Sequence, residues 1–185
     1  MHNEVNKLII FDRDGTLNKL VNQEKELRSP RSLDEFKLIE GAREVLMTLK
    51  SQGNFIGIAT NQPEVSRKFI SIEELNLMHK YLLEEIECID VIEVCVHDNQ
   101  DNCICRKPRV GLLEKIFENY NISKDYCYII GDKWTDVLAG KNFKIKSILI
   151  EKEYSYKPTS QGECPKELIP DFTIHDIRES IKIFL

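Results

Sequence analysis

The sequence predicts an α/β fold, in which a doubly wound, Rossmann-like parallel sheet carries helices on both faces. Short apolar runs recur along the chain, and segments with the 3.6-residue helical period lie between them. Strands that alternate with helices in this way form parallel sheets. A length of 185 residues suffices for one well-buried core, so we expect a single domain over residues 1–185.

The first half of the chain contains four expected elements. Residues 8–11 form an apolar run that is too short for a helix, and we expect a buried strand there. Apolar residues at helical spacing follow at 42–49, a second short apolar run covers 55–59, and a second helical pattern covers 75–86. Each helix then has a sheet face to cover.

The second half repeats this alternation. The expected strands are residues 91–96, 127–130, 145–150 and, as a short addition, 172–174. A helical pattern covers 112–117, and another helix follows the strand at 127–130. Asp176 is placed to cap a last helix, whose residues 177, 181 and 184 face inward.

Two long stretches, residues 18–40 and 151–170, show neither period. Long connections in a compact domain are usually functional or mobile. Because 18–40 leaves directly from an Asp-Gly turn after the first strand, we expect it to form a flap over a site. The alternative is a solvated excursion with a structural role only.

Composition excludes several classes of protein. The formal net charge is −5 and no block of like charge occurs, so we expect no nucleic-acid partner. No apolar run approaches the ~20 residues needed to cross a bilayer, and we see no secretion signal. We therefore expect a cytoplasmic monomer that does not associate with membranes.

Acidic residues follow two of the expected strands, at the edge where parallel strands end. Asp12 and Asp14 follow the first strand, and Gly15 permits a sharp exit. Asp132 ends the strand at 127–130, and Asp136 lies in the first turn of the next helix. Each residue alone is an ordinary turn or capping residue. Together, Asp12, Asp14 and Asp132 predict an oxygen-rich site suited to Mg2+.

Two further polar pairs belong with these carboxylates. Thr60 and Asn61 follow the strand at 55–59 and can donate hydrogen bonds to a phosphate. Arg106 and Lys107 precede the helix at 112–117. A lysine can neutralise a phosphoryl oxygen, and an arginine can hold an oxyanion with its planar fork. In isolation, a solvated basic pair would be the simpler interpretation.

In this order, the motifs resemble those of the haloacid dehalogenase (HAD) superfamily of phosphotransferases, over essentially the whole chain. Asp12-Arg13-Asp14-Gly15-Thr16 resembles the first motif, Thr60 the second, Lys107 the third, and Gly131-Asp132 with Asp136 the fourth. The resemblance implies a HAD-like sheet with all four motifs at its carboxyl edge, no large cap domain, and Mg2+ as a cofactor.

From these residues and the resemblance we expect hydrolysis of a phosphomonoester through an aspartyl-phosphate. Asp12 would attack phosphorus, and Asp14 would protonate the leaving oxygen and then activate water. The surroundings of Asp14 should therefore disfavour its charged form. Asp132 would bind Mg2+ with Asp12 and the Asp14 carbonyl, and Asp136 would act through a metal-bound water or by orienting Lys107. Thr60 and Asn61 would hold the phosphoryl oxygens. By resemblance, Arg106 and Lys133 would bind the rest of the substrate.

A cysteine-rich segment precedes Arg106. Cytosolic thiols stay reduced, and clustered cysteines there more often bind metal than form disulfides. The clustered residues are Cys95, His97, Cys103 and Cys105. They make a closed Cys3His set, typical of structural Zn2+ sites, with a chance cluster of free thiols as the alternative. Because Cys105 adjoins Arg106, a zinc-fixed loop would also order Arg106 and Lys107.

With Arg13 between the two aspartates, this zinc set resembles one branch of the superfamily. The branch contains D-glycero-D-manno-heptose 1,7-bisphosphate phosphatases and the N-terminal domain of bifunctional histidinol-phosphate phosphatases. It implies a small phosphorylated substrate, a heptose (bis)phosphate, with histidinol phosphate as the alternative. The chain departs from the branch at Val96, where proline is usual, and at 63–68, where a glycine-containing segment is usual. Arg67 still offers a cation near the substrate.

A role of a different class is a non-catalytic module that binds phosphate or uses the zinc loop to contact a partner. A pure binder would not need a nucleophile and a proton donor together, which argues against this role. Basic residues in the expected flap favour an anionic substrate; they are Lys19, Lys25, Arg28 and Arg31.

Overall fold

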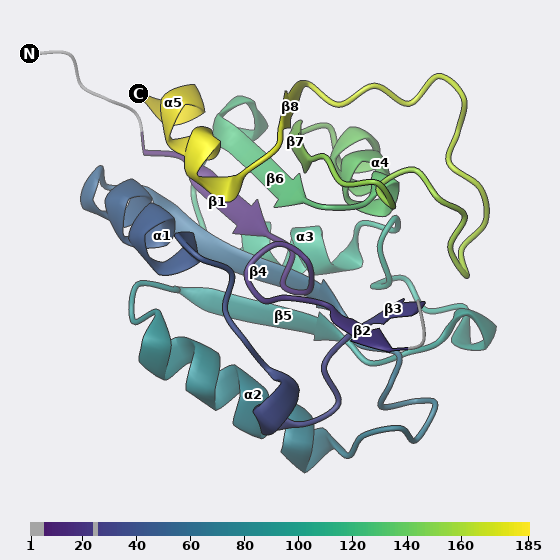
Figure 1. Ribbon diagram of the computed structural model, residues 1–185. Coiled ribbons are helices and arrows are strands. Elements are labelled where there is room, and N and C mark those ends of the chain that lie inside the picture. Colours follow the sequence, from purple (N-terminus) through teal and green to yellow (C-terminus); the bar gives the residue numbers. More distant parts are fainter. Residues whose placement is uncertain (1–5, 24–25) are drawn as a thin grey trace, which may run out of the picture.

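The computed structural model describes residues 6–23 and 26–185. Its main sheet has six parallel strands in the order β5-β4-β1-β6-β7-β8 (Figure 1). The strands are β1 (Leu8–Phe11), β4 (Phe55–Asn61), β5 (Val91–Cys95), β6 (Cys127–Gly131), β7 (Lys146–Ile150) and β8 (Phe172–Ile174). The predicted doubly wound sheet is thus confirmed.

Helices cover both faces of this sheet. They are α1 (Ala42–Ser51), α2 (Ile72–Glu85), α3 (Gly111–Phe117), α4 (Trp134–Phe143) and α5 (Ile181–Phe184). Strand residues alternate between the two faces. In β1, Ile9 packs with α1 and α2 in one core, whereas Ile10 packs with α3 and α4 in the other. A strand buried on both faces is continuously apolar, which explains the run at 8–11.

Strands β1 and β8 have the expected bounds, and the other elements differ from the expected ones by one to three residues. Strand β4 continues to Asn61, so the Thr-Asn pair belongs to the strand and does not follow it. Helix α2 begins at Ile72, because the Ser71 side chain accepts a hydrogen bond from Glu74 N and caps the helix. Asp176 caps the last helical segment as expected, but the first turn, Ile177–Ser180, is a 3-10 helix that precedes α5.

The two stretches without periodicity both lie beyond the carboxyl ends of the strands (Figure 1). Residues 18–40 contain the antiparallel hairpin of β2 (Val21–Gln23) and β3 (Glu26–Arg28), followed by the 3-10 turn Leu33–Glu35. Residues 151–170 contain turns and no strand or helix. Lys25 lies outside the described residues.

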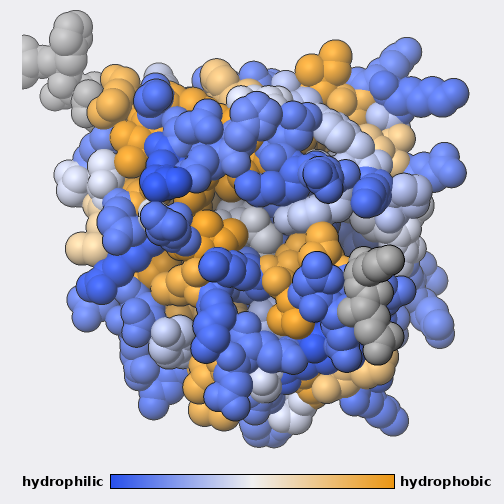
Figure 2. Space-filling view, in the orientation of Figure 1, coloured by the Kyte–Doolittle hydropathy of each residue, from blue (hydrophilic) through white to orange (hydrophobic). Residues whose placement is uncertain are grey.

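The visible surface is mostly hydrophilic, and hydrophobic side chains reach it in small separate areas (Figure 2). Within residues 6–23 and 26–185, no helix combines the length and apolarity that a membrane span requires.

Candidate active site

Three carboxylates meet where β1 and β6 end. These strands pair in parallel, so Asp12 after β1 lies beside Asp132 after β6, and Asp136 reaches both from the first turn of α4. The three side chains are buried, and one oxygen of each lies within 4.8 Å of the others. Asp136 takes the place that we expected for the carboxylate of Asp14.

This carboxylate cluster fits a divalent cation. Neither oxygen of Asp132 has a hydrogen-bond partner among the described residues, although the side chain is fully buried. A buried carboxylate without a partner is costly, and Mg2+ prefers oxygen ligands of this kind. Gly15 leaves room for the Asp132 carboxylate in this position, because a Cβ at Gly15 would lie 2.0 Å from Oδ2 of Asp132.

The charges of the cluster are coupled. Burial raises the pKa of Asp12 to about 6, although Lys107 offsets part of the rise. Burial likewise raises the pKa of Asp132 to about 7, against the nearby Lys133. Without a cation, the protein therefore resists full ionisation of the cluster at neutral pH.

Lys107 is buried between two of these carboxylates. Its Nζ lies 2.6 Å from Oδ1 of Asp12 and 2.6 Å from Oδ1 of Asp136. Burial alone would lower the pKa of Lys107, but the two carboxylates outweigh it and raise the pKa above its usual value. Lys107 is thus a permanent cation next to Asp12, and Asp136 orients it.

Asp14 points away from the cluster. Its carboxylate accepts two hydrogen bonds from Arg13, at 2.9 and 3.0 Å, and one from Nε2 of Gln62 at 2.7 Å. Burial would raise the pKa of Asp14, but the Arg13 guanidinium and the Gln62 hydrogen bond outweigh it, and the pKa lies below its usual value. The expectation that its surroundings disfavour the charged form is therefore wrong for this conformation.

Arg13 itself has a partner, His79, that no motif or spacing in the sequence predicts. Its Nη1 lies 2.9 Å from Nε2 of His79, on the buried side of α2. Burial, helped by the charge of Arg13, lowers the pKa of His79 to about 4, so the imidazole is neutral and accepts this hydrogen bond. Gln62 was also missed, although its alternation with Thr60 along the chain was a usable signal.

The residues at the end of β4 support this arrangement. Thr60 is buried, and its Oγ1 accepts a hydrogen bond from Gln62 Nε2 at 2.8 Å. Asn61 exchanges two hydrogen bonds of 3.0 Å with the backbone N and O of Lys107. The amide of Asn61 therefore fixes the Lys107 backbone beside the site.

The second cluster brings together the four sulfur and imidazole ligands expected for zinc. They are Cys95, His97, Cys103 and Cys105, with one ligand atom of each within 4.8 Å of the others. Sγ of Cys95 lies 3.0 Å from that of Cys105 and 3.6 Å from that of Cys103. All four converge on one point, so the donor set fits a closed tetrahedral metal site.

The segment between these ligands, residues 95–105, holds two of the basic residues expected to bind substrate. Arg106 donates from Nε to Oδ1 of Asn99 at 2.9 Å and from Nη1 to the His97 carbonyl at 3.2 Å. Arg67 makes two 2.7 Å hydrogen bonds to Asp98. Ordering this segment therefore orders both guanidinium groups.

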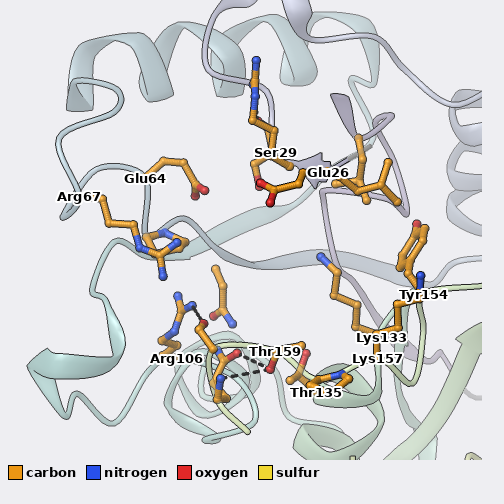
Figure 3. Close-up of a pocket in the computed structure, with 18 of the residues that line it drawn as sticks. Glu26, Ser29, Glu64, Arg67, Arg106, Lys133, Thr135, Tyr154, Lys157 and Thr159 are labelled. Atoms are coloured by element: carbon orange, nitrogen blue, oxygen red, sulfur yellow. Dashed lines mark hydrogen bonds between the residues drawn. The ribbon is translucent and has the colours of Figure 1, made fainter. Parts of the chain in front are cut away.

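A cavity of about 570 Å³ opens next to the carboxylate cluster (Figure 3). Its walls come from the hairpin, the turn after β4, Arg106, the start of α4 and residues 154–161. Six cationic side chains line it: Arg28, Arg31, Arg67, Arg106, Lys133 and Lys157. A smaller cavity contains Asp12, Asp14 and Lys107 and shares Asn61 and Lys133 with the larger one. Lys19 does not line either of these two cavities.

Comparisons with known proteins agree with this geometry. A family model described as HAD-hydrolase-like matches residues 104–180. A D-glycero-beta-D-manno-heptose-1,7-bisphosphate 7-phosphatase of Neisseria meningitidis serogroup A is 33% identical over 137 residues, which cover 72% of this chain and 71% of the relative. The histidine biosynthesis bifunctional protein HisB of Legionella pneumophila is 29% identical over 178 residues. That match covers 94% of this chain and only 47% of HisB.

A solved structure shares the whole fold. The crystal structure of a D,D-heptose 1,7-bisphosphate phosphatase from B. bronchiseptica, complexed with magnesium and phosphate, superposes with a TM-score of 0.78. The two chains are 26% identical, and the match covers 96% of this chain and 97% of the other.

Proposed function

Because the chain belongs to the haloacid dehalogenase-like hydrolases and is a phosphatase of that superfamily, we propose that it hydrolyses a phosphomonoester of a D-glycero-D-manno-heptose bisphosphate. One observation carries the proposal. Lys107 neutralises Asp12 in the smaller cavity, beside the carboxylate cluster, and this cavity shares Asn61 and Lys133 with the larger one, which is lined by six cations.

The reaction proceeds in two halves. An oxygen of Asp12 attacks phosphorus, the bond to the ester oxygen breaks, and that oxygen takes a proton from Asp14. Water then attacks the aspartyl-phosphate, Asp14 takes its proton, and inorganic phosphate leaves. Lys107 reduces the repulsion between the Asp12 carboxylate and the incoming phosphate, and Thr60 holds a phosphoryl oxygen.

The position of Asp14 suits the second half. Held by Arg13, it is an ionised base that can accept a proton from water. To act as the acid of the first half, its carboxyl group takes up a proton and leaves Arg13.

Mg2+ is the proposed cofactor of the carboxylate cluster. Asp12, Asp132 and the Asp14 carbonyl would hold it, with Asp136 beside them on Lys107. When bound, it supplies positive charge to the phosphoryl oxygens.

Zn2+ is the proposed occupant of the Cys3His cluster, where it would have a structural role. The basic side chains of Arg106 and Arg67 bind to the segment that this metal would fix. We also propose that residues 1–185 form one domain and that the enzyme is a cytoplasmic monomer, which sedimentation analysis would test for the oligomeric state.

Histidinol phosphate is the second candidate substrate, favoured by the similarity to HisB. Six cations in the cavity favour instead a substrate with a second anionic group. The test compares kcat/KM for heptose 1,7-bisphosphate, heptose monophosphate and histidinol phosphate. We expect the bisphosphate to be best by at least tenfold, and a preference for histidinol phosphate would overturn the heptose assignment.

A further inference from the structure

Glu64 lines the large cavity with a buried carboxylate that lacks a hydrogen-bond donor among the described residues. Its side chain extends into the space opposite Ser29 (Figure 3), and only 7% of the residue is exposed. Its Oε2 is buried and has no hydrogen-bond partner within the described residues. The backbone is fixed, because the Glu64 carbonyl accepts hydrogen bonds from Phe69 N at 2.9 Å and Ile70 N at 3.4 Å.

The arginines of the same cavity donate no hydrogen bond to the Glu64 carboxylate among the described residues. Arg28 makes two hydrogen bonds to Glu35, at 2.8 and 2.7 Å, and Arg67 makes its two to Asp98. Across the described chain, no cationic group lies within 4.0 Å of the Glu64 carboxylate in an ion pair. A buried carboxylate of this kind is costly unless a ligand supplies the hydrogen-bond donor.

The surroundings limit which donor can bind there. A doubly ionised phosphate has no proton to donate and would be repelled by the carboxylate. An ammonium group would be repelled by the six cations around it. A hydroxyl group is neutral and donates, so it fits both the acceptor and its surroundings.

Resting on the proposed function, we infer that Glu64 is a specificity-determining residue that accepts hydrogen bonds from hydroxyl groups on the carbon skeleton between the two phosphates of the substrate. The two cavities share Asn61 and Lys133. A ligand whose reacting phosphate lies at Asp12 therefore continues into the large cavity, where Glu64 can contact its skeleton.

The test is Glu64→Gln, which keeps the shape and removes the charge. Two substrates are compared: heptose 1,7-bisphosphate, and 1,6-hexanediol bisphosphate, which has two phosphates and no free hydroxyl. A hydrogen bond to a charged group is worth about 10- to 100-fold in affinity, so we expect kcat/KM for the heptose to fall by about that factor. The value for the hexanediol compound should stay level within about threefold. Glu44→Gln, an exposed residue in the first turn of α1 that lies outside both cavities, is the matched control and should change neither value.

Other outcomes overturn the inference. An equal fall for both substrates, or a fall in melting temperature that accounts for the loss, would make Glu64 a structural residue. A rise for both would mean that it only repels anions. If the wild type prefers histidinol phosphate and Glu64→Gln abolishes that preference, the carboxylate binds an ammonium group. The wild-type kcat/KM values test the proposed function separately, because a wild type that hydrolyses heptose bisphosphate poorly refutes it whatever the variant does.

Discussion

At the scale of single residues, the pKa values of Asp12 and Asp14 shift in opposite directions, although each carboxylate lies beside a buried cation. Burial keeps the pKa of Asp12 near 6 even beside Lys107, whereas the paired guanidinium of Arg13 outweighs burial and lowers the pKa of Asp14. Carboxylates whose environments separate their pKa values typically have different roles in catalysis. The two residues thus differ in pKa as well as in the direction in which their side chains point.

Asp12→Asn is the direct test of the nucleophile. An amide cannot form the acyl phosphate, so we expect kcat to fall by about a thousandfold or more. Lys107 retains its contact with Asp136, so the fold should survive. Steady-state kinetics and circular dichroism measure the two effects. Turnover retained at more than a few per cent would mean that another residue is the nucleophile.

His79→Ala tests the support behind Asp14. Removing the imidazole leaves a buried N–H of Arg13 without its acceptor, which should cost about 1–3 kcal/mol in the free energy of unfolding. It should also lower kcat by about tenfold, because Arg13 then holds Asp14 less firmly. His79→Asn, which restores an acceptor, should recover part of both losses.

The control for this variant is His175→Ala, because that side chain is 72% exposed and lies outside the site. An unchanged kcat in folded His79→Ala would show that Arg13 needs no such support.

What the sequence could reveal about these residues depended on their distance along the chain. Asp12, Asp132 and Lys107 each follow a strand or precede a helix, so the alternating pattern alone predicted that they would meet. His79 is 66 residues from Arg13 and sits on a helix whose period marks it only as inward-facing. Contacts of that kind depend on how a helix packs, which a pattern of apolar residues does not determine.

At the scale of elements, the hairpin and Arg106, which the Cys3His segment holds in place, line one cavity. The spacing of Cys95, His97, Cys103 and Cys105 was enough to predict that these four side chains meet just before Arg106. The hairpin at 18–40 was expected only as a flap, and its strands β2 and β3 were missed. They are three residues each and largely exposed, so they carry no apolar alternation.

Cys103→Ser tests whether the Cys3His segment, residues 95–105, acts on catalysis. Loss of one ligand should lower the zinc content and loosen Asn99 and the His97 carbonyl, both of which hold Arg106. We expect kcat/KM to fall by about tenfold or more. The fall should come mainly from KM, because the hydrogen bonds that hold Arg106 in place for the substrate would be loosened. Elemental analysis and kinetics on the same sample provide the measurement.

Cys164→Ser removes a thiol outside the cluster and should leave zinc content and kinetics unchanged. A Cys103→Ser protein that lacks zinc but keeps full activity would refute the coupling.

At the scale of the whole molecule, the strand order explains why distant motifs converge. Strands β4, β1 and β6 are adjacent, so Thr60, Asp12 and Asp132 share one edge of the sheet. Ligands in open α/β sheets bind at this edge. The alternation of strands and helices predicted this arrangement, whereas the cavity walls at 18–40 and 151–170 could not be predicted, because neither stretch has a periodic pattern.

The two candidate metal sites offer different ligand atoms, carboxylate oxygens in one and thiolates with an imidazole in the other. One metal should therefore be removable without the other. Brief treatment with a weak chelator should remove Mg2+ from the oxygen ligands and leave Zn2+ on its thiolates. We expect hydrolysis to stop while zinc content is unchanged, and to return on adding Mg2+. Activity that persists with zinc alone would contradict the separate roles proposed for the two metals.

The stability of the metal-free protein should depend on pH through the carboxylate cluster. In the folded protein the pKa values of Asp12 and Asp132 are about 6 and about 7, above the ordinary value of 3.8. A raised pKa means that the folded state binds these protons more tightly than the unfolded state does. Their contribution to stability is therefore fully present below pH 4 and is lost as the pH rises through 6 to 7.

Mg2+ should reverse this loss, because it binds the ionised carboxylates. Saturating Mg2+ should raise the melting temperature by about 5 °C or more at pH 8 and by much less at pH 5. In Asp132→Asn, which cannot ionise at this position, the metal-free protein should lose less stability between pH 5 and pH 8 and respond weakly to Mg2+. Calorimetry at the two pH values decides the matter. An equal response to Mg2+ at both would mean that the ion binds somewhere other than this cluster.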